Sequence, residues 1–498
     1  MPLSAVKPVA MPADVETLRT LANQAFSRTA GAPLVAGNAV RVLRDATENY
    51  PVWERAMREA RRSIHVEMYI FHRDPVGRRF VALLAERARA GVDVRVVYDW
   101  FGCGFGPAFG LFSPLIAAGG QVRPFNPPAI TAALGWLRRN HRKLIVIDGR
   151  VAFVGGLCIG QAWQGRPEKG QEPWRYTGIE IVGPAVAYAE SSFAESWRLT
   201  GGQVHHRSTP ARAGAEPETV TLEPPRADAI ATTPSAGAVS LRLIPTEPFT
   251  ANLLRLDLLV ASLARKSLWI TDAYFIGTSS YLEALKRAAA DGVDVRLLLP
   301  QGSDVGWTVP VSRSLYRPLL EAGVRIFEWN GTMVHAKTAV ADSRWSRIGS
   351  TNLNINSWLG NWELDVAIED AVVSQTLEEH YVADLERSTE IVLKTYRLRP
   401  RLRRPPGLSA PPSRRHRSAR RVVRTVTDVS RSIGAAVTGN RQLEDFEVMP
   451  VVAVALVFAA IAAIGFLAPR ALAWPLAVIA AWAALTFVIE AVQLWKRR

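Results

Sequence analysis

The feature that most constrains the fold is an internal repeat. The stretch ARRSIHVEMYIFHRDPVGRRFVALLAERARAGVDVRVVYD at 60–99 returns as ARKSLWITDAYFIGTSSYLEALKRAAADGVDVRLLLP at 264–300. The apolar pattern of each copy predicts a strand, a helix and a second strand, at 63–71, 77–90 and 94–98 in the first copy and at 267–275, 280–290 and 295–299 in the second. A strand–helix–strand of this length is a parallel unit. We therefore expect an α/β fold of two halves in a pseudo-two-fold arrangement.

Composition divides the chain further. The stretch between the two copies is rich in Pro, Thr and Ala and has weak periodicity, which is typical of a linker. A segment rich in Arg, Pro and Ser follows the second half, and two apolar runs come after it. We predict six segments: an N-terminal helical segment at 1–39, a first half at 40–205, a linker at 206–237, a second half at 238–395, a basic linker at 396–447 and a pair of membrane helices at 448–498.

The apolar runs predict a membrane anchor. Residues 448–468 and 471–489 carry no charge, and only Pro469-Arg470 interrupts them. Each run has about 20 residues, the length that crosses a bilayer core, so the pair predicts a C-terminal transmembrane hairpin. The alternative is a buried helical hairpin in a soluble fold. Basic residues flank both ends and the N-terminal stretch has no apolar signal sequence. We therefore expect a multi-pass membrane protein with both ends of the hairpin, and the two halves before it, in the cytoplasm.

The positive charge is concentrated in one stretch. The net charge is +15, but residues 394–441 carry 14 Lys and Arg and a single acid, Asp428, so this stretch supplies +13 and the rest +2. A nearly balanced globular part makes nucleic acid an unlikely partner. Within the stretch, 419–432 predicts either a basic amphipathic helix on anionic lipids or a solvated tether. With only Cys103 and Cys158 and no metal-ligand spacing, we expect no disulfide scaffold, metal or cofactor.

One constellation of polar residues occurs in both halves with the same spacing. It comprises His141, Lys143, Asp148, Gly155 and Gly156 in the first half and His335, Lys337, Asp342, Gly349 and Ser350 in the second. Residues two apart on a strand share a face, so each His and Lys point the same way. Asp148 falls on the other face, and Asp148-Gly149 is a good tight-turn dipeptide, which favours a structural role for this Asp. The small residues that end the return strand let backbone N–H groups approach an anion.

These residue types suit chemistry at phosphorus. A lysine ammonium neutralises non-bridging oxygens, and an imidazole can act as nucleophile or acid. Two such sets across a pseudo-two-fold place histidines on opposite sides of one phosphate, so one attacks while the other protonates the departing oxygen. No metal is needed because the lysines supply the positive charge.

The duplicated motif resembles that of the phospholipase D superfamily, also called HKD enzymes, and within it the bacterial cardiolipin synthases. The supporting stretches are GAPLVAGNAVRVLRD at 31–45, VEMYIF at 66–71, GVDVRVVYDWFG at 91–102, HRKLIVIDGRVAFVGG at 141–156, EIVGPAV at 180–186, HAKTAVAD at 335–342 and GSTNLNINS at 349–357. The resemblance implies two phospholipase D-like α/β/α sandwich lobes, a covalent phosphohistidine and phosphatidyl transfer between lipids such as phosphatidylglycerol. It also implies that both His-Lys-Asp sets are catalytic, and that the predicted anchor lies in the bacterial inner membrane with the catalytic lobes cytoplasmic.

Further roles are carried over from the resemblance. The family's polar and acidic support in the second half is matched by Ser350, Asn352 and Glu363. In the first half, the glycine pair Gly155-Gly156 is matched to substrate binding. In related enzymes the first histidine is often the nucleophile, which suggests that His141 attacks and His335 is the general acid.

The first half departs from the family pattern twice. Cys158 stands where the phosphate-side Asn is usual, and Tyr176 stands where an acid is usual. Tyr cannot balance an imidazolium at neutral pH, so we expect the second-half histidine to be the better supported. Besides a phosphatidyltransferase, the sequence allows a phospholipase D hydrolase, an HKD nuclease or a non-catalytic, membrane-tethered lipid-binding protein.

Overall fold

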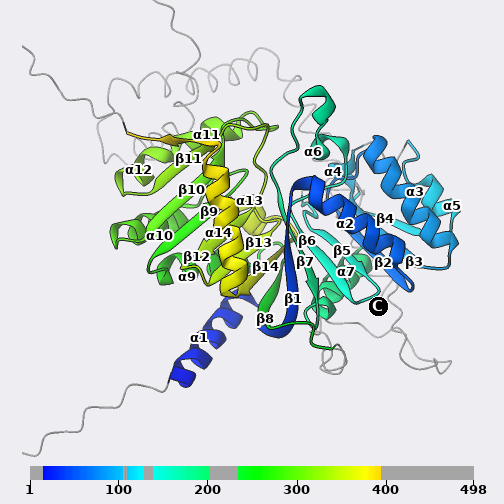
Figure 1. The fold of residues 1–498 in the computed structure, drawn as a ribbon, viewed down its shortest axis with the longest axis horizontal. Coiled ribbons are helices and arrows are strands. Elements are labelled where there is room, and N and C mark those ends of the chain that lie inside the picture. Colours follow the sequence, from blue (N-terminus) through cyan, green and yellow to red (C-terminus); the bar gives the residue numbers. More distant parts are fainter. Residues whose placement is uncertain (1–14, 105–106, 108, 128–137, 202–233, 394–498) are drawn as a thin grey trace, which may run out of the picture.

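The computed structural model describes residues 15–104, 107, 109–127, 138–201 and 234–393 (Figure 1). The predicted basic linker 396–447 and membrane hairpin 448–498 lie outside the described residues, as does most of the predicted linker 206–237. Within the described ranges, no helix combines the length and apolar character that a membrane span needs.

Fifteen strands form one continuous sheet. Those of the first half are β1 Val35–Arg44, β2 Ser63–Met68, β3 Asp93–Asp99, β4 Gln121–Phe125, β5 Lys143–Ile147, β6 Val151–Gly155 and β7 Thr177–Val182. Those of the second half are β8 Val239–Thr246, β9 Ser267–Thr271, β10 Asp294–Pro300, β11 Arg325–Trp329, β12 Thr338–Ala341, β13 Trp345–Gly349, β14 Glu363–Glu369 and β15 Ser388–Ile391.

The strand order displays the repeat directly. From the centre outward, the first half runs β1-β7-β6-β5-β2-β3-β4 and the second runs β8-β14-β13-β12-β9-β10-β11, with β15 added at the outer edge. Antiparallel pairing of β1 with β8 joins the halves, so they share one sheet. The prediction of an α/β fold with two equivalent halves is confirmed.

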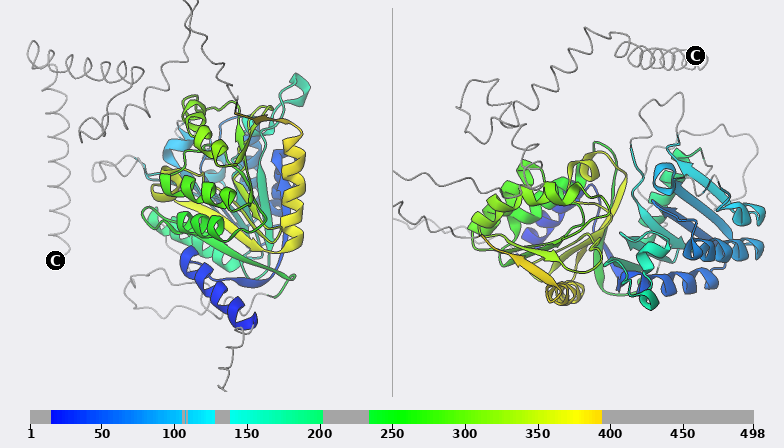
Figure 2. Two further views of the ribbon diagram at one scale, coloured as in Figure 1. Left: turned by 90° about the vertical axis from the view of Figure 1, so that its left-hand side faces the viewer. Right: turned by 90° about the horizontal axis from the view of Figure 1, so that it is seen from above.

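Helices cover the sheet in both halves (Figure 2). They are α1 Val15–Ala30, α2 Asp45–Glu59, α3 Pro75–Arg89, α4 Trp100–Cys103, α5 Ser113–Ala117, α6 Gln161–Gln164, α7 Val186–Leu199, α9 Asn252–Leu263, α10 Ser279–Ala290, α11 Thr308–Ser314, α12 Tyr316–Glu321, α13 Ile355–Leu359 and α14 Ala371–Leu385, with a short 3-10 turn at Pro167–Lys169. The strand β1 begins inside the segment predicted to precede the first half.

The predicted strand–helix–strand units form as expected. β2 pairs parallel with β3, and β9 pairs parallel with β10. Helix α3 begins where Asp74 accepts a hydrogen bond from the N–H of Gly77, with Pro75 in the first turn, a favourable start for a helix. Both first strands end earlier than predicted, at Met68 and Thr271, and the chain after each makes only an isolated bridge, Phe71 with Ile159 and Ile276 with Asn354.

Three large apolar cores hold these layers. One lies between the first-half strands and α2, α3 and α5, and a second lies between the second-half strands and α1, α9, α10 and α12. The third contains side chains of α7, α14 and strands of both halves, including Phe193, Ile348 and Leu377. Because this third core joins the halves, it fixes the junction where the two polar motifs meet.

Candidate active site

The two histidines lie at the junction of the halves, and each is held there by the opposite half. The backbone N–H of His141 donates to the carbonyl of Trp362 at 2.8 Å, and that of His335 donates to the carbonyl of Arg175 at 2.8 Å. A Cβ atom built on Gly156 of the first half would lie 3.4 Å from the His335 carbonyl oxygen and 3.5 Å from Cδ of Lys337. The expected convergence of the two motifs is therefore present.

A carboxylate from the second half supports the first-half histidine. Nδ1 of His141 lies 2.8 Å from Oε2 of Glu363, which is fully buried. The Ser350 hydroxyl donates to the same oxygen at 2.6 Å, and the Asn361 amide donates to Oε1 at 3.2 Å. Burial alone would raise the pKa of Glu363, but the neighbouring His141 and Lys143 and the hydrogen bonds lower it below its usual value. The carboxylate therefore stays ionised.

The protonation of His141 follows from this contact. Burial is the largest influence and lowers its pKa to about 4; Glu363 opposes the shift, and the Lys143 ammonium adds to it. The ring is therefore neutral near pH 7. Because an ionised carboxylate only accepts, Nδ1 carries the ring proton and Nε2 keeps its lone pair. A neutral imidazole with a free, oriented Nε2 is the form that a nucleophile needs.

Aromatic rings enclose the second-half histidine. The His335 ring centroid lies 4.9 Å from that of Tyr176, 5.3 Å from that of Tyr274 and 6.0 Å from that of Trp174. Its pKa lies well below the usual value, first through burial and then through the positive charges of Lys337 and Lys143. No acidic side chain in the described part of the chain forms an ion pair with this ring.

The equivalence of Tyr176 and Glu363 is visible in the backbone. Glu363 follows Trp362, whose carbonyl holds His141, and Tyr176 follows Arg175, whose carbonyl holds His335. The Tyr176 hydroxyl is buried and has no hydrogen-bond partner in the described part of the chain. The expectation that Glu363 supports the histidine of its own half is wrong: the acid acts across the junction, and the first-half histidine is the one with a carboxylate.

The lysines bring positive charge beside both rings. Nζ of Lys143 donates to the His141 carbonyl at 2.6 Å, and Nζ of Lys337 donates to the His335 carbonyl at 2.7 Å and lies 2.8 Å from Nδ1 of that ring. Burial lowers the pKa of Lys337 to about 7; Asp272 opposes the shift, and Lys143 contributes to it. Burial also lowers the pKa of Lys143. Because the charge of Lys143 contributes to lowering the pKa of Lys337, a bound anion that offsets both charges is favoured here.

The remaining substrate-side residues have unequal roles. Glycine is needed at Gly155 because a Cβ there would lie 2.9 Å from Cα of Gly178 on the neighbouring strand, and at Gly349 because it would lie 2.0 Å from Oδ1 of Asp365. Only Gly156 borders Lys337. Asn352 is buried, with its Oδ1 unpaired among the described residues, and donates to Ser357 at 3.5 Å.

The two motif aspartates are not brought to the histidines. Asp148 and Asp342 occupy hairpin turns with φ of 56° and 53°, and each carboxylate accepts the N–H groups of three consecutive residues, which begin at Arg61 and Arg265. Asp148 lies at the far end of β5 from Lys143, roughly 16 Å along the strand. The structural interpretation fits this geometry, and a direct catalytic role does not.

Sequence reasoning missed two tyrosines that line the site. Tyr69 packs edge-on against His141, at 4.7 Å between centroids, and Lys143 Nζ lies 4.9 Å from its centroid. Tyr274 has the same relation to His335 and Lys337. A tyrosine just after the first strand of each repeat copy is the signal that could have identified them.

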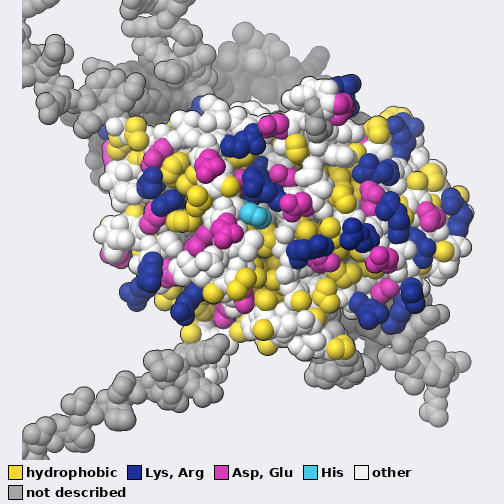
Figure 3. All heavy atoms as spheres, viewed as in Figure 1, with side chains coloured by type: hydrophobic (Ala, Val, Ile, Leu, Met, Phe, Trp, Pro, Cys, Tyr) yellow, Lys and Arg dark blue, Asp and Glu magenta, His cyan; other side chains and the backbone are white. Residues whose placement is uncertain are grey.

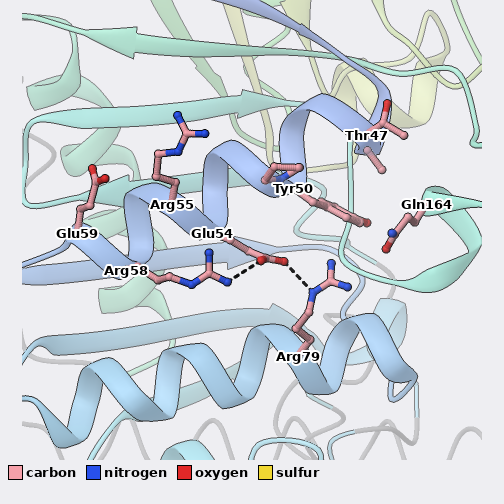
Figure 4. Close-up of a pocket in the computed structure, with 10 residues that line it drawn as sticks. Thr47, Tyr50, Glu54, Arg55, Arg58, Glu59, Arg79 and Gln164 are labelled. Atoms are coloured by element: carbon pink, nitrogen blue, oxygen red, sulfur yellow. Dashed lines mark hydrogen bonds and ion pairs between the residues drawn. The ribbon is translucent and has the colours of Figure 1, made fainter.

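A separate surface pocket lies away from this chemistry. It has a volume of about 650 Å³ and is lined mainly by α2, with Glu54 bound to both Arg58 and Arg79 (Figure 4). Tyr50 at its base donates to the Cys158 carbonyl at 2.7 Å. It contains no motif residue, and two of its arginines, Arg58 and Arg79, are paired with Glu54, so it is not the candidate active site.

Comparison with known proteins assigns the family. The family described as "Cardiolipin synthase, PLD-like domain" matches residues 54–162 and 260–385. The cardiolipin synthase of Halalkalibacterium halodurans is 32% identical over 378 residues, covering 75% of this chain and 71% of the relative. The chain belongs to the cardiolipin synthase, PLD-like family. Cardiolipin synthase A of Pseudomonas syringae pv. syringae is also 32% identical over 377 residues, 74% of this chain and 73% of the relative.

A solved structure supports the fold of this phospholipase D-type family member. The phosphatidylserine synthase of Haemophilus influenzae Rd KW20 superposes with a TM-score of 0.55 at 14% identity, covering 74% of this chain and 91% of the other. At this identity the likeness concerns the fold alone. The sequence matches, and not this structural likeness, assign the chain to a family of phosphatidyltransferases.

Proposed function

We propose that this protein is a membrane-anchored phosphatidyltransferase that makes cardiolipin or a related anionic phospholipid through a phosphohistidine. The observation that carries the proposal is the asymmetric pair at the junction: His141 is neutral and oriented by Glu363 at 2.8 Å, and His335 lies opposite with Lys337 at 2.8 Å. The chain's membership of the cardiolipin synthase family gives phospholipids such as phosphatidylglycerol as the substrate class.

In the first step Nε2 of His141 attacks the phosphorus of one phosphatidylglycerol. The bond from phosphorus to the glycerol headgroup oxygen breaks, and His335 donates a proton to that oxygen so that glycerol leaves. His335 is neutral in the empty site, but a bound phosphodiester places a negative charge beside it and offsets the charge of the lysines. This raises its affinity for the proton it must donate.

In the second step the neutral His335 takes the proton of an acceptor hydroxyl. The acceptor oxygen attacks the phosphorus, the bond from phosphorus to His141 breaks, and the diphosphatidyl product leaves. If water takes the acceptor's place, the same site releases phosphatidic acid, which is the hydrolase alternative. The lysines hold the non-bridging oxygens in both steps.

The charge outside the basic stretch 394–441 argues against a nuclease, because it amounts to only +2. Figure 3 shows Lys and Arg side chains interspersed with Asp and Glu on this face, without a continuous basic stripe. Nucleic-acid binding depends on a concentrated basic footprint.

The test incubates the full-length protein with phosphatidylglycerol labelled either in the headgroup glycerol or in an acyl chain. We expect headgroup label to be released as free glycerol and acyl label to appear in cardiolipin. Acyl label only in phosphatidic acid would identify a hydrolase. No turnover of any phospholipid would favour the non-catalytic lipid-binding alternative. Lys286→Ala, a partly exposed change on α10 that removes only a surface ion pair with Glu283, serves as the control.

Membrane attachment is a separate part of the proposal and rests on the uncharged runs 448–468 and 471–489. Deleting 448–498 should release the protein from membranes, or leave it bound only through the basic segment and removable by high salt. A deleted form that resists carbonate washing would locate the anchor elsewhere. A reporter after Arg498 that is active only outside the cytoplasm would contradict the proposed topology.

A further inference from the structure

In the described part of the chain, the exposed Phe and Trp side chains lie beyond the carboxyl ends of strands in both halves. Among the described residues, the large hydrophobic side chains with high exposure include four that are Phe or Trp: Phe101 at 52%, Phe109 at 66%, Phe249 at 74% and Trp307 at 63%. All four follow the carboxyl ends of β3, β8 or β10. Exposed aliphatic residues are scattered, as on most proteins, but this concentration is not a scattered pattern.

These carboxyl ends border the junction where the two histidines lie. The last residue of β3, Asp99, accepts the N–H of Asn140, which precedes His141, at 2.8 Å, and Phe101 follows two residues later. The last residue of β8, Thr246, pairs with Glu363, and Phe249 follows. We define the rim as Phe101, Phe249, Trp307 and Ile355, with the two arginines described below.

The other half borders the site in the same way. Asp304, which follows β10, accepts the Tyr274 hydroxyl at 2.7 Å, and the Tyr274 ring packs on His335; Trp307 comes three residues later. Ile355, 51% exposed, begins α13 a few residues after Ser350. Both halves therefore contribute to one rim around one site.

Positive charge accompanies the aromatic rings. The Arg139 guanidinium carbon lies 4.0 Å from the ring centroid of Phe101, and that of Arg138 lies 5.0 Å from the centroid of Phe249. These arginines directly precede Asn140 and His141. Stacking keeps each guanidinium beside its aromatic ring. The guanidinium can then contact a phosphate while the ring is buried in apolar surroundings.

We propose that this rim docks on the surface of an anionic phospholipid bilayer and turns the active-site mouth toward its lipid substrates. The proposal rests on the proposed function for the identity of the substrate. Aromatic rings paired with arginines are the chemistry of the bilayer interface, where rings sit among headgroups and cations contact phosphates. A protein bound to the same rim would cover the mouth, whereas a bilayer presents the substrate there.

The first experiment measures how deeply the rim inserts into the bilayer. Trp307→Cys and Phe249→Cys are made in the full-length protein, labelled with an environment-sensitive fluorophore and reconstituted in phosphatidylglycerol–phosphatidylethanolamine vesicles that carry a quencher on the lipid chains. The native Cys103 and Cys158 are 6% and 3% exposed, so unlabelled wild type is the check for background labelling. Arg150→Cys, on the turn at the opposite end of β5, is the matched control.

We expect strong quenching and a blue-shifted emission at positions 307 and 249, and neither at position 150. Equal quenching at the three positions, or quenching at 150 alone, would overturn the proposal. Vesicles of phosphatidylcholine alone should give weaker quenching, because the arginines then meet no net negative charge. A shift at 307 and 249 that appears without lipid would indicate contact with protein and would also overturn it.

The second experiment separates docking from catalysis. Turnover of phosphatidylglycerol in vesicles is divided by turnover of a short-chain phosphatidylglycerol dissolved as monomer. Combining Phe249→Ser with Trp307→Ser should lower this ratio roughly tenfold, the effect of losing one or two inserted apolar side chains. Leu263→Ser, a change of an exposed apolar side chain (45%) at the other end of α9, should leave the ratio at the wild-type value.

The outcomes distinguish the two proposals. An unchanged ratio in the double variant, with an active wild type, would reject docking and leave the transferase. A wild type that turns over neither substrate would reject the transferase, and the quenching pattern would still decide the docking.

Discussion

The two halves of the site share a fold but give their histidines different surroundings. His141 is bonded to an ionised carboxylate, which fixes its tautomer. His335 is enclosed by Tyr176, Tyr274 and Trp174, and the nearest polar side chain is the Lys337 ammonium. A duplicated motif does not imply duplicated chemistry. The partner that arrives from the other half decides which ring is prepared to attack and which to exchange a proton.

The largest expected effect concerns which histidine is the nucleophile, because a reversal of the two roles would overturn this comparison. His141→Ala should abolish turnover, roughly 10⁴-fold or more, and leave no phosphatidyl label on the protein. His335→Ala should also be severely impaired but should still trap acid-labile acyl label, because attack remains possible while release is slowed. The measurement is label retained on denatured protein. Label on His141→Ala and none on His335→Ala would reverse the roles.

Glu363 provides the next largest effect. Glu363→Gln keeps the shape of the side chain but removes the charge that orients and stabilises the His141 ring, so we expect kcat to fall by roughly 10²–10⁴-fold. Thr376→Ala, on the outer surface of α14, is the control for handling and folding. If Glu363→Gln loses no more than tenfold, the carboxylate is only a packing element, and the contrast between the halves loses its chemical meaning.

The convergence of the two histidines could be predicted from sequence, but the position of the acid could not. Duplicated spacing and strand alternation are local patterns, so they place His141 with Lys143 and His335 with Lys337 correctly. The Glu363–His141 contact spans 222 residues and crosses the junction of the halves. It depends on how β14 and the segment before β5 meet after folding, and no local periodicity encodes that relation.

The aspartates show the opposite case, in which local reasoning was the better guide. Alternation places Asp148 on the turn of its hairpin, where it accepts backbone N–H groups. The family motif alone groups it with the catalytic residues. The positive φ of Asp148 and Asp342 suits a tight hairpin turn, which explains why an Asp is present at this spacing without chemistry to perform.

The pH profile sharpens the contrast between the halves. His141 must be neutral to attack, and its pKa is lowered to about 4, so kcat/KM should fall as pH drops through about 4. Lys337 must be charged to hold the phosphate, and its pKa is lowered to about 7, so kcat/KM should fall as pH rises through about 7. In Glu363→Gln the loss of the neighbouring negative charge should move the acidic limb to lower pH. An acidic limb that stays in place would assign it to another group.

Asp148→Ala should have a smaller effect, and it should act on the stability of the fold. Losing its backbone hydrogen bonds should destabilise the fold by about 1–3 kcal/mol, seen as a lower midpoint of chemical unfolding. The pKa of Asp148 is lowered: burial acts against this, but the N–H groups of residues 61–63 outweigh it. The stabilisation that the ionised Asp148 gives to the fold is therefore present above the usual Asp pKa and is lost as pH falls through the lowered pKa. A large fall in kcat at unchanged stability would restore a catalytic role.

The smallest effect is the most direct test of the difference between the halves. Tyr176 stands where the first half would need an acid, and its buried hydroxyl has no partner among the described residues. Removing an unpaired buried hydroxyl relieves a desolvation penalty, so Tyr176→Phe should stabilise the protein by about 1 kcal/mol and change kcat by less than about twofold. Tyr50→Phe is the contrasting control, because its hydroxyl donates to the Cys158 carbonyl and its loss should destabilise. If Tyr176→Phe instead costs tenfold or more in kcat and moves the pH profile, the hydroxyl acts on His335 in the loaded site, and the second histidine has a polar partner after all.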